Sequence, residues 1–177
     1  MDVDPGARTE PARRLVLLRH AKSSWEDDLP DVERRLAPRG RRDAAQAGHW
    51  LAEHVGKPDL VLCSTAVRTR QTWAGVAEAE PGVLGPVPVR FEPTIYEAWS
   101  GTLLDLARGL PEDVGTAVLV GHGPGLPDLA ERLNRASGSR PLPPFRTSAV
   151  AVFAVSGPWH GLDPGTATLT AFAVPSG

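Results

Sequence analysis

Short apolar runs alternate with longer, more polar segments along most of the chain. Three continuous apolar runs are typical of strands buried on both faces of a sheet. They are residues 15–18, 60–62 and 117–120. Four segments between and after these runs predict helices, and in the first of them apolar residues recur every three or four positions along one stripe. These segments are residues 39–55, 67–79, 102–109 and 126–134.

Three further segments have the pattern of more exposed strands. Residues 87–91 alternate between apolar and polar side chains, which indicates a half-exposed strand near a sheet edge. Residues 148–155 and 167–174 are rich in β-branched side chains and are separated by a turn-rich stretch, so a C-terminal strand pair is expected. The whole order predicts an α/β fold with three layers, in which helices cover both faces of a mostly parallel central sheet.

Length and charge narrow the class of protein. The chain has 177 residues, which fits one domain, expected over residues 14–177 after a polar, flexible tail at 1–13. Its net charge of -2 argues against a general nucleic-acid binder. A single cysteine excludes an intramolecular disulfide framework and a cysteine-rich zinc site. Neither a signal-peptide pattern nor a membrane-length apolar run is found, so a cytoplasmic location without membrane contact is expected.

Polar residues follow each of the three buried strands. Arg19 and His20 come after the first, Ser64 ends the second with Arg68 one turn on, and His122 follows the third. Because ligands of open α/β sheets bind outside the carboxyl ends of the strands, we expect two imidazoles and two guanidiniums at one rim.

This set of groups favours phosphoryl transfer. Guanidiniums bind phosphate oxygens with two parallel hydrogen bonds, and a neutral imidazole can attack phosphorus to form a covalent intermediate. Nearby arginines would keep His20 neutral near pH 7, and His122 could donate to the developing charge. No cluster of carboxylates suggests a metal, and no cofactor is expected.

The segment L-L-R-H-A-K-S-S-W at residues 17–25 resembles the N-terminal signature of the histidine phosphatase superfamily, and more narrowly of its small SixA-type phosphohistidine phosphatases. Three further segments match that subfamily in order. They are E-R-R-L with R-G at residues 33–40, S-T-A-V-R-T-R-Q-T at 64–72 and V-G-H-G-P-G at 120–125. The resemblance covers about residues 14–155 and implies a phosphoglycerate-mutase-like fold.

The resemblance also implies roles for individual residues. His20 corresponds to the phosphorylated nucleophile, and Arg19, Arg68 and His122 complete the phosphate pocket. Glu97 stands where many members carry a proton donor, although a solvated carboxylate at a helix start is an equal reading. No metal or other cofactor is implied.

Five positions near these motifs carry further expectations. Lys22 and Arg34 are predicted to extend the positive rim and bind substrate, with solvated cations as the alternative. Ala21 replaces the glycine of the broader superfamily, Gly123 replaces the usual asparagine, and Arg35 replaces the usual proline. None of these departures removes a group that the chemistry requires.

The implied substrate is a phosphohistidine on a protein, such as a member of a signalling relay. A broad small-molecule phosphomonoesterase, a mutase-like enzyme on the same fold and a non-catalytic phosphoprotein-binding module remain alternatives. A cysteine-dependent phosphatase is disfavoured, because four residues separate Cys63 from Arg68 where that class needs five. Cys63 is instead expected to be a small buried group. The oligomeric state is not predicted.

Overall fold

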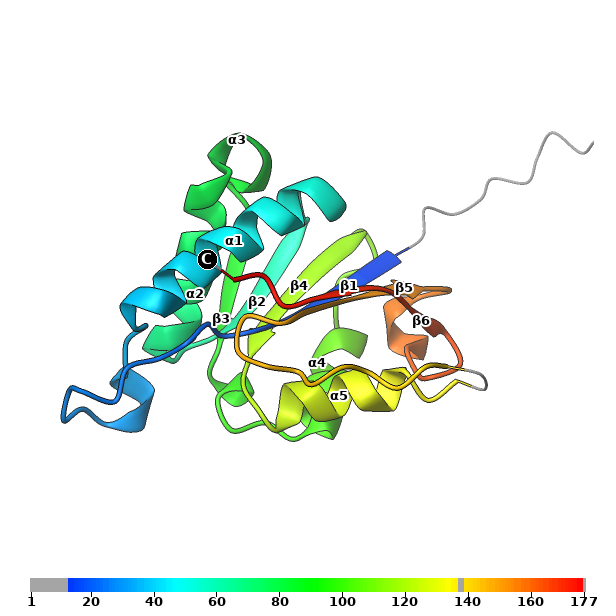
Figure 1. The fold of residues 1–177 in the computed structure, drawn as a ribbon. Helices are drawn as coiled ribbons and strands as arrows, with labels where there is room; N and C mark the ends of the chain where they lie inside the picture. The colour runs from blue at the N-terminus through cyan, green and yellow to red at the C-terminus, as the bar shows by residue number, and fades with distance from the viewer. Residues whose placement is uncertain (1–12, 137–138, 177) are drawn as a thin grey trace, which may run out of the picture.

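The computed structural model describes residues 13–136 and 139–176, in which strands and helices alternate (Figure 1). The strands are β1 (Arg13–Arg19), β2 (Leu60–Ser64), β3 (Val89–Glu92), β4 (Thr116–Gly121), β5 (Val150–Val155) and β6 (Ala167–Ala173). The α-helices are α1 (Pro38–His54), α2 (Val67–Ala79), α3 (Pro81–Leu84), α4 (Ser100–Arg108) and α5 (Gly125–Leu133). Three short 3-10 helices are η1 (Asp31–Glu33), η2 (Pro93–Ile95) and η3 (Trp159–Gly161). The predicted strands and the four long helices are confirmed, whereas the short α3 was not predicted.

The predicted N-terminal tail lies almost wholly outside the described residues. Its last residue, Arg13, is the exception, because it begins β1 and pairs with Val155 of β5. The Arg13 guanidinium also forms an ion pair with Glu112, with Nη2 2.9 Å from Oε2. Arg13 therefore belongs to the folded part. No helix within the described ranges is long and apolar enough to cross a membrane.

The six strands form one sheet in the order β3-β2-β4-β1-β5-β6. The first four strands of this order run parallel to one another, while β5 is antiparallel to both β1 and β6. The predicted C-terminal strand pair and the edge position of β3 are thereby confirmed. Since β4 lies between β1 and β2, the chain segments that follow these three strands emerge side by side.

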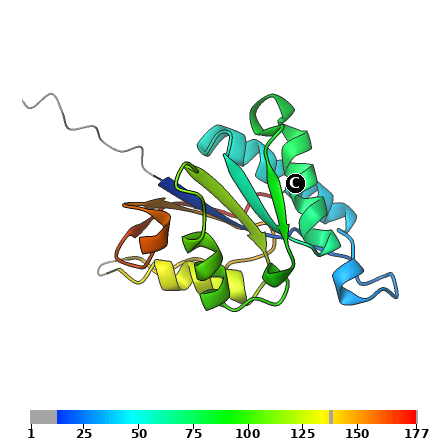
Figure 2. The ribbon, with the colours of Figure 1, turned by 180° about the vertical axis from the view of Figure 1, so that it is seen from behind.

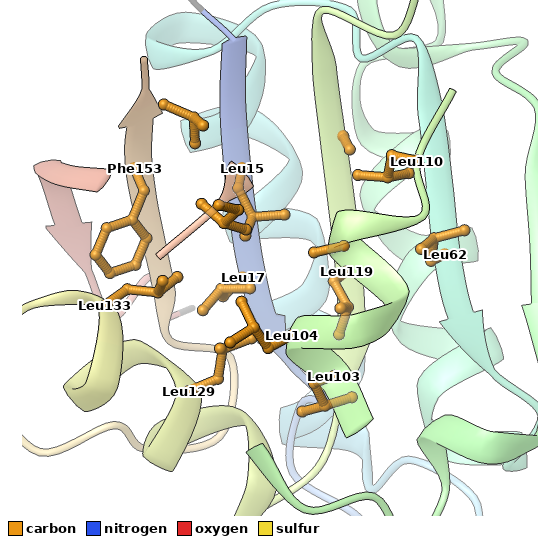
Figure 3. Close-up of a cluster of buried hydrophobic side chains, with 14 of the residues drawn as sticks. Leu15, Leu17, Leu62, Leu103, Leu104, Leu110, Leu119, Leu129, Leu133 and Phe153 are labelled. Atoms are coloured by element: carbon orange, nitrogen blue, oxygen red, sulfur yellow. The ribbon is translucent and has the colours of Figure 1, made fainter. Parts of the chain in front are cut away.

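Helices cover both faces of the sheet, and the residues of β1 alternate between the two cores. Leu15 and Leu17 face the layer of α4 and α5, where they pack with Leu103, Leu104 and other leucines (Figure 3). Val16 and Leu18 belong to the opposite core, which includes apolar side chains of α1 and α2. Figures 1 and 2 show the two helical layers from opposite sides. Burial on both faces stabilises β1 by roughly 1.5–3 kcal/mol for each fully buried side chain.

The contact between α1 and α2 depends on a glycine. A Cβ atom on Gly48 would lie 2.4 Å from the carbonyl oxygen of Val76 and 2.8 Å from the Cβ of Ala79. Both distances are too short for real contacts, so a larger residue would push the helices apart.

We therefore expect Gly48→Ala to lower the free energy of unfolding by about 1–3 kcal/mol, the usual cost of overpacking, as measured by urea denaturation. The control is Gly82→Ala in α3, because no heavy atom lies within 4 Å of a Cβ there. Equal losses in both variants would contradict this account of the helix contact.

Candidate active site

The register between β1 and β4 brings the two candidate histidines together. Arg19, the last residue of β1, pairs with Gly121, the last residue of β4. The next residue of each strand is a histidine, and the backbone N–H of His20 donates to the carbonyl of Gly121 at 3.1 Å. The ring centroids of His20 and His122 are 5.3 Å apart. The structure thus places both imidazoles at the carboxyl edge of the sheet, as the strand order predicts.

One ring nitrogen of His20 is hydrogen-bonded to the backbone, and the other keeps a lone pair that can attack an electrophile. Its Nδ1 lies 2.8 Å from the carbonyl oxygen of Ala21, which can only accept, so Nδ1 carries the proton and Nε2 keeps its lone pair. Burial lowers the pKa of His20 to about 4, and the positive charges of Arg68 and Arg19 act in the same direction. The ring is therefore neutral at pH 7, the state that a nucleophilic imidazole needs.

His122 is neutral for similar reasons. Burial lowers its pKa to about 3, with further contributions from His20 and Arg68. Its Nε2 lies 2.7 Å from the hydroxyl oxygen of Ser64, which ends the neighbouring strand β2. Its Nδ1 is buried and has no hydrogen-bond partner among the described residues. That nitrogen is the one left for a ligand.

Arg19 lies under the loop that follows β4. Its Nη1 donates to the carbonyl of Phe145 at 2.7 Å, which fixes the guanidinium. A Cβ atom on Gly123 would lie 3.0 Å from Nη2 of Arg19. The absence of a side chain at Gly123, where the subfamily usually has asparagine, leaves room for the guanidinium.

Arg68 reaches the site from the first turn of α2. Its Nη1 donates to the backbone carbonyl of Asp31 at 2.7 Å and its Nη2 to Oδ2 of Asp31 at 3.1 Å. The Nε atoms of Arg68 and Arg19 are buried and, within the described ranges, have no partner. A buried donor without a partner costs about 1–3 kcal/mol, and an anion with several oxygens could satisfy such donors together. With Nδ1 of His122, the site holds three nitrogens of this kind.

Asp31 supplies a negative charge that the motif analysis did not identify. Its Oδ1 accepts from Nη1 of Arg34 at 2.8 Å, and its Oδ2 accepts from both Arg68 and the hydroxyl of Tyr96. The hydrogen bond from Tyr96, followed by the one from Arg34, holds the pKa of Asp31 well below its usual range. The signal in the sequence is the three-residue spacing between Asp31 and Arg34, which is typical of an ion pair within one turn.

Arg34 binds Asp31, and all of the guanidinium nitrogens of Arg34 have protein partners. Nη1 binds Asp31, Nη2 donates to the hydroxyl of Ser23, and Nε donates to the carbonyl of Ser24 at 3.2 Å. The guanidinium carbon also stacks 3.2 Å from the ring centroid of Trp25. These contacts place Arg34 as a support for Asp31, and its direct contact with substrate stays a prediction.

A cavity of about 280 Å³ opens next to His122. Its lining includes Asp31, Arg68, Tyr96, Glu97, Trp99 and His122. Glu97 is exposed on this wall, so the structure brings it to the cavity but leaves its role as proton donor a prediction. Trp99 is 73% exposed and provides an apolar rim. Lys22 is not part of this wall and lines a different cavity.

Two other residues of the motif at 64–72, Gln71 and Thr72, hold loops of the site in place. The hydroxyl oxygen of Thr72 accepts from the backbone N–H of Ala21 at 2.9 Å and donates to the carbonyl of Arg68 at 2.7 Å. The side-chain oxygen of Gln71 accepts from the backbone N–H of Leu36 at 2.8 Å. Sequence reasoning recognised this motif but gave these two side chains no role.

Cys63 has none of the properties of a catalytic thiol. It is fully buried, and its sulfur donates to the carbonyl of Ser64 at 3.4 Å. Burial raises its pKa to about 12, so the thiol is protonated at pH 7. Its predicted burial is confirmed, and the cysteine-phosphatase alternative loses its nucleophile. In the part of the chain that the structure describes, no three His, Cys, Asp or Glu side chains group as a metal site would require.

The low pKa of His20 predicts a pH-dependent stability. Its pKa falls from 6.5 to about 4 on folding, so below pH 6.5 the unfolded chain binds a proton that the folded protein does not. Stability then decreases as the pH falls from 6.5 towards 4, by at most about 1.4 kcal/mol per pH unit for one such group.

Urea denaturation at pH 7 and pH 5 should show a smaller loss of unfolding free energy for His20→Gln than for the native protein. His160→Gln, at an exposed position, should behave like the native protein. Parallel losses in the native protein and His20→Gln would contradict this prediction.

Known proteins are similar to this chain in sequence and in fold. Residues 15–134 match the model of the histidine phosphatase superfamily, branch 1. An uncharacterised protein of Mycobacterium tuberculosis is 40% identical over 164 residues, which cover 89% of this chain and 99% of that protein. A candidate phosphohistidine phosphatase SixA from Nakamurella multipartitia is 33% identical with a TM-score of 0.79, covering 93% of this chain and 96% of that one.

A second candidate SixA structure, from Agrobacterium tumefaciens, is 29% identical with a TM-score of 0.74, and the match covers 92% of this chain and 98% of that one. The predicted phosphoglycerate-mutase-like α/β fold is confirmed by these likenesses. Because the family match spans more than half of the chain and includes His20, Arg68 and His122, the chain belongs to the histidine phosphatase superfamily, in which it is of the SixA type.

Proposed function

We propose that the protein is a phosphatase that transfers a phosphoryl group to Nε2 of His20 and then to water. The observation that carries this proposal is the neutral imidazole of His20 among three buried nitrogens that have no described partner. A phosphoryl group would give Nε2 of His20 an electrophilic phosphorus to attack. Its oxygens would accept hydrogen bonds from the three buried nitrogens.

The reaction has two steps. Nε2 of His20 attacks phosphorus while the bond to the leaving group breaks, and the leaving group departs with its electron pair and takes up a proton. Arg19 and Arg68 donate to the phosphoryl oxygens, and His122 donates through Nδ1–H while Nε2 accepts from Ser64. Water then attacks the phosphorus of phosphohistidine, which releases inorganic phosphate and restores His20.

Protein phosphohistidine is the proposed substrate. It is supported by the resemblance to SixA-type proteins and by the names of the two structural relatives. A leaving imidazole can carry its own proton, so this substrate makes an acid on the enzyme less necessary. No metal is required by the two steps, and the proposed enzyme is metal-independent.

One observation favours a second candidate function, the hydrolysis of phosphomonoesters. Glu97 is exposed on the wall of the cavity that His122 also lines. An alkoxide leaving group is far more basic than imidazole and needs a proton as it departs, which a carboxylic acid at this place could supply.

The decisive experiment offers chelator-treated protein a phosphohistidine peptide and a phosphoserine peptide and measures phosphate release from each. We expect release mainly from phosphohistidine, because its leaving group needs no acid. Equal or preferential release from phosphoserine would replace the proposed substrate with a broader ester class. No release from either would remove the proposed activity.

Two substitutions and a control test the chemistry. His20→Ala should abolish release because it removes the nucleophile, and Arg68→Ala should lower the rate on the order of 10²-fold, as loss of a transition-state donor does. Cys63→Ser should retain most of the activity. Turnover by the His20→Ala protein would rule out the mechanism.

Glu97→Gln separates the two leaving groups. We expect phosphoserine turnover to fall on the order of tenfold or more, while phosphohistidine turnover changes by less than about twofold. Glu53→Gln, at an exposed position of α1, is the matched control. A similar decrease for both substrates would exclude a proton-donor role of Glu97.

A further inference from the structure

A second cavity borders the side chain of Arg19. It measures about 340 Å³, and its lining includes Arg19, Lys22, Arg39, Asp43 and Arg146. Among the described residues, none lines both this cavity and the one next to His122. Arg19 belongs to the second cavity and approaches Gly123 of the first, so its side chain separates the two spaces.

The charge of the second cavity is strongly positive. Four of its described lining residues are cationic and one, Asp43, is acidic. The Asp43 carboxylate already lies 3.5 Å from Nε of Arg39. Lys22 and Arg146 are exposed, and their side chains form no ion pair or hydrogen bond with the part of the chain that the structure describes. Several cations around one hollow attract anions far more strongly than isolated surface charges do.

The wall of this cavity is fixed to the active site. Ser148 is buried in a left-handed conformation with φ 63°, which a residue with a side chain rarely adopts. Its N–H donates to the carbonyl of His20 at 3.1 Å, and its hydroxyl donates to the carbonyl of Pro175 at 2.9 Å. The C-terminal segment after β6 is thereby tied to this loop and runs towards α1 (Figure 1). The second cavity therefore keeps a set position relative to His20.

We propose that the second cavity binds the carboxylate of an acidic side chain close to the phosphorylated residue of a polypeptide substrate. This inference rests on the proposed phosphatase function and deepens it. A ligand that fills both cavities must carry two anionic groups and pass over Arg19, as an acidic phosphopeptide does. The forked guanidiniums of Arg146 and Arg39 suit a carboxylate, and Lys22 adds a point charge.

The test measures binding rather than turnover. His20→Ala protein is titrated with two peptides that carry a stable phosphohistidine analogue, one flanked by glutamates and the other by glutamines. We expect the glutamate peptide to bind about tenfold more tightly at low salt, and we expect this preference to shrink as salt increases. Adding Arg146→Glu should abolish the preference, because it reverses one charge of the cavity.

The matched control is Arg42→Glu, which makes the same change of charge at an exposed position of α1 outside the cavity and should keep the preference. Equal affinity for the two peptides, or a preference that survives Arg146→Glu in folded protein, would overturn the inference. Phosphate release by the unsubstituted protein is measured separately. If that release is absent while the binding preference persists, the phosphatase function fails and the acidic subsite stands.

Discussion

The parallel pairing of β1 with β4 is the interaction on which the active site depends. It aligns Arg19 with Gly121, so the next residue of each strand places an imidazole at the same edge. Because β4 also pairs with β2, Ser64 lies on the other side of His122 and binds its Nε2. Side chains alternate along a strand, so a shift of one residue in this register would turn these groups to opposite faces. The apolar cores on both faces of β1 hold the register.

The electrostatics at this edge of the sheet have two causes: the histidine rings are buried, and arginine side chains lie close to them. Burial and the neighbouring guanidiniums keep His20 neutral. Asp31 balances part of the positive charge through Arg34 and Arg68, and its negative charge is stabilised by Tyr96. The Nε atoms of Arg19 and Arg68 nevertheless have no hydrogen-bond partner among the described residues. An anion with several oxygens could satisfy such donors, and donors that are fixed before an anion binds are the general basis of electrostatic catalysis.

The sequence predicted much of the site but not all of it. The placement of Arg19, His20, Arg68 and His122 near one edge could be predicted because strand ends in a parallel sheet meet there, whereas their roles stay predictions. Lys22 follows His20 by only two residues, yet its side chain lines a different cavity. Arg34 was placed at the rim, and the structure binds all of its guanidinium nitrogens to other groups. Loop side chains can point in several directions, and their partners come from distant segments, so local pattern does not settle their contacts.

The sequence alone determined the order of the strands and the four long helices, the buried character of β1, β2 and β4, and the residues that follow these three strands. These features depend on hydrophobic periodicity and on turn-forming residues, which act locally. Only the tertiary structure decided that Asp31 binds Arg68 across 37 residues, that Trp159 is buried with its indole N–H donating to Val114, and that Ser148 joins His20 to the C-terminal segment. Each of these contacts joins residues far apart in the chain, so each exists only once the sheet and its helices have packed.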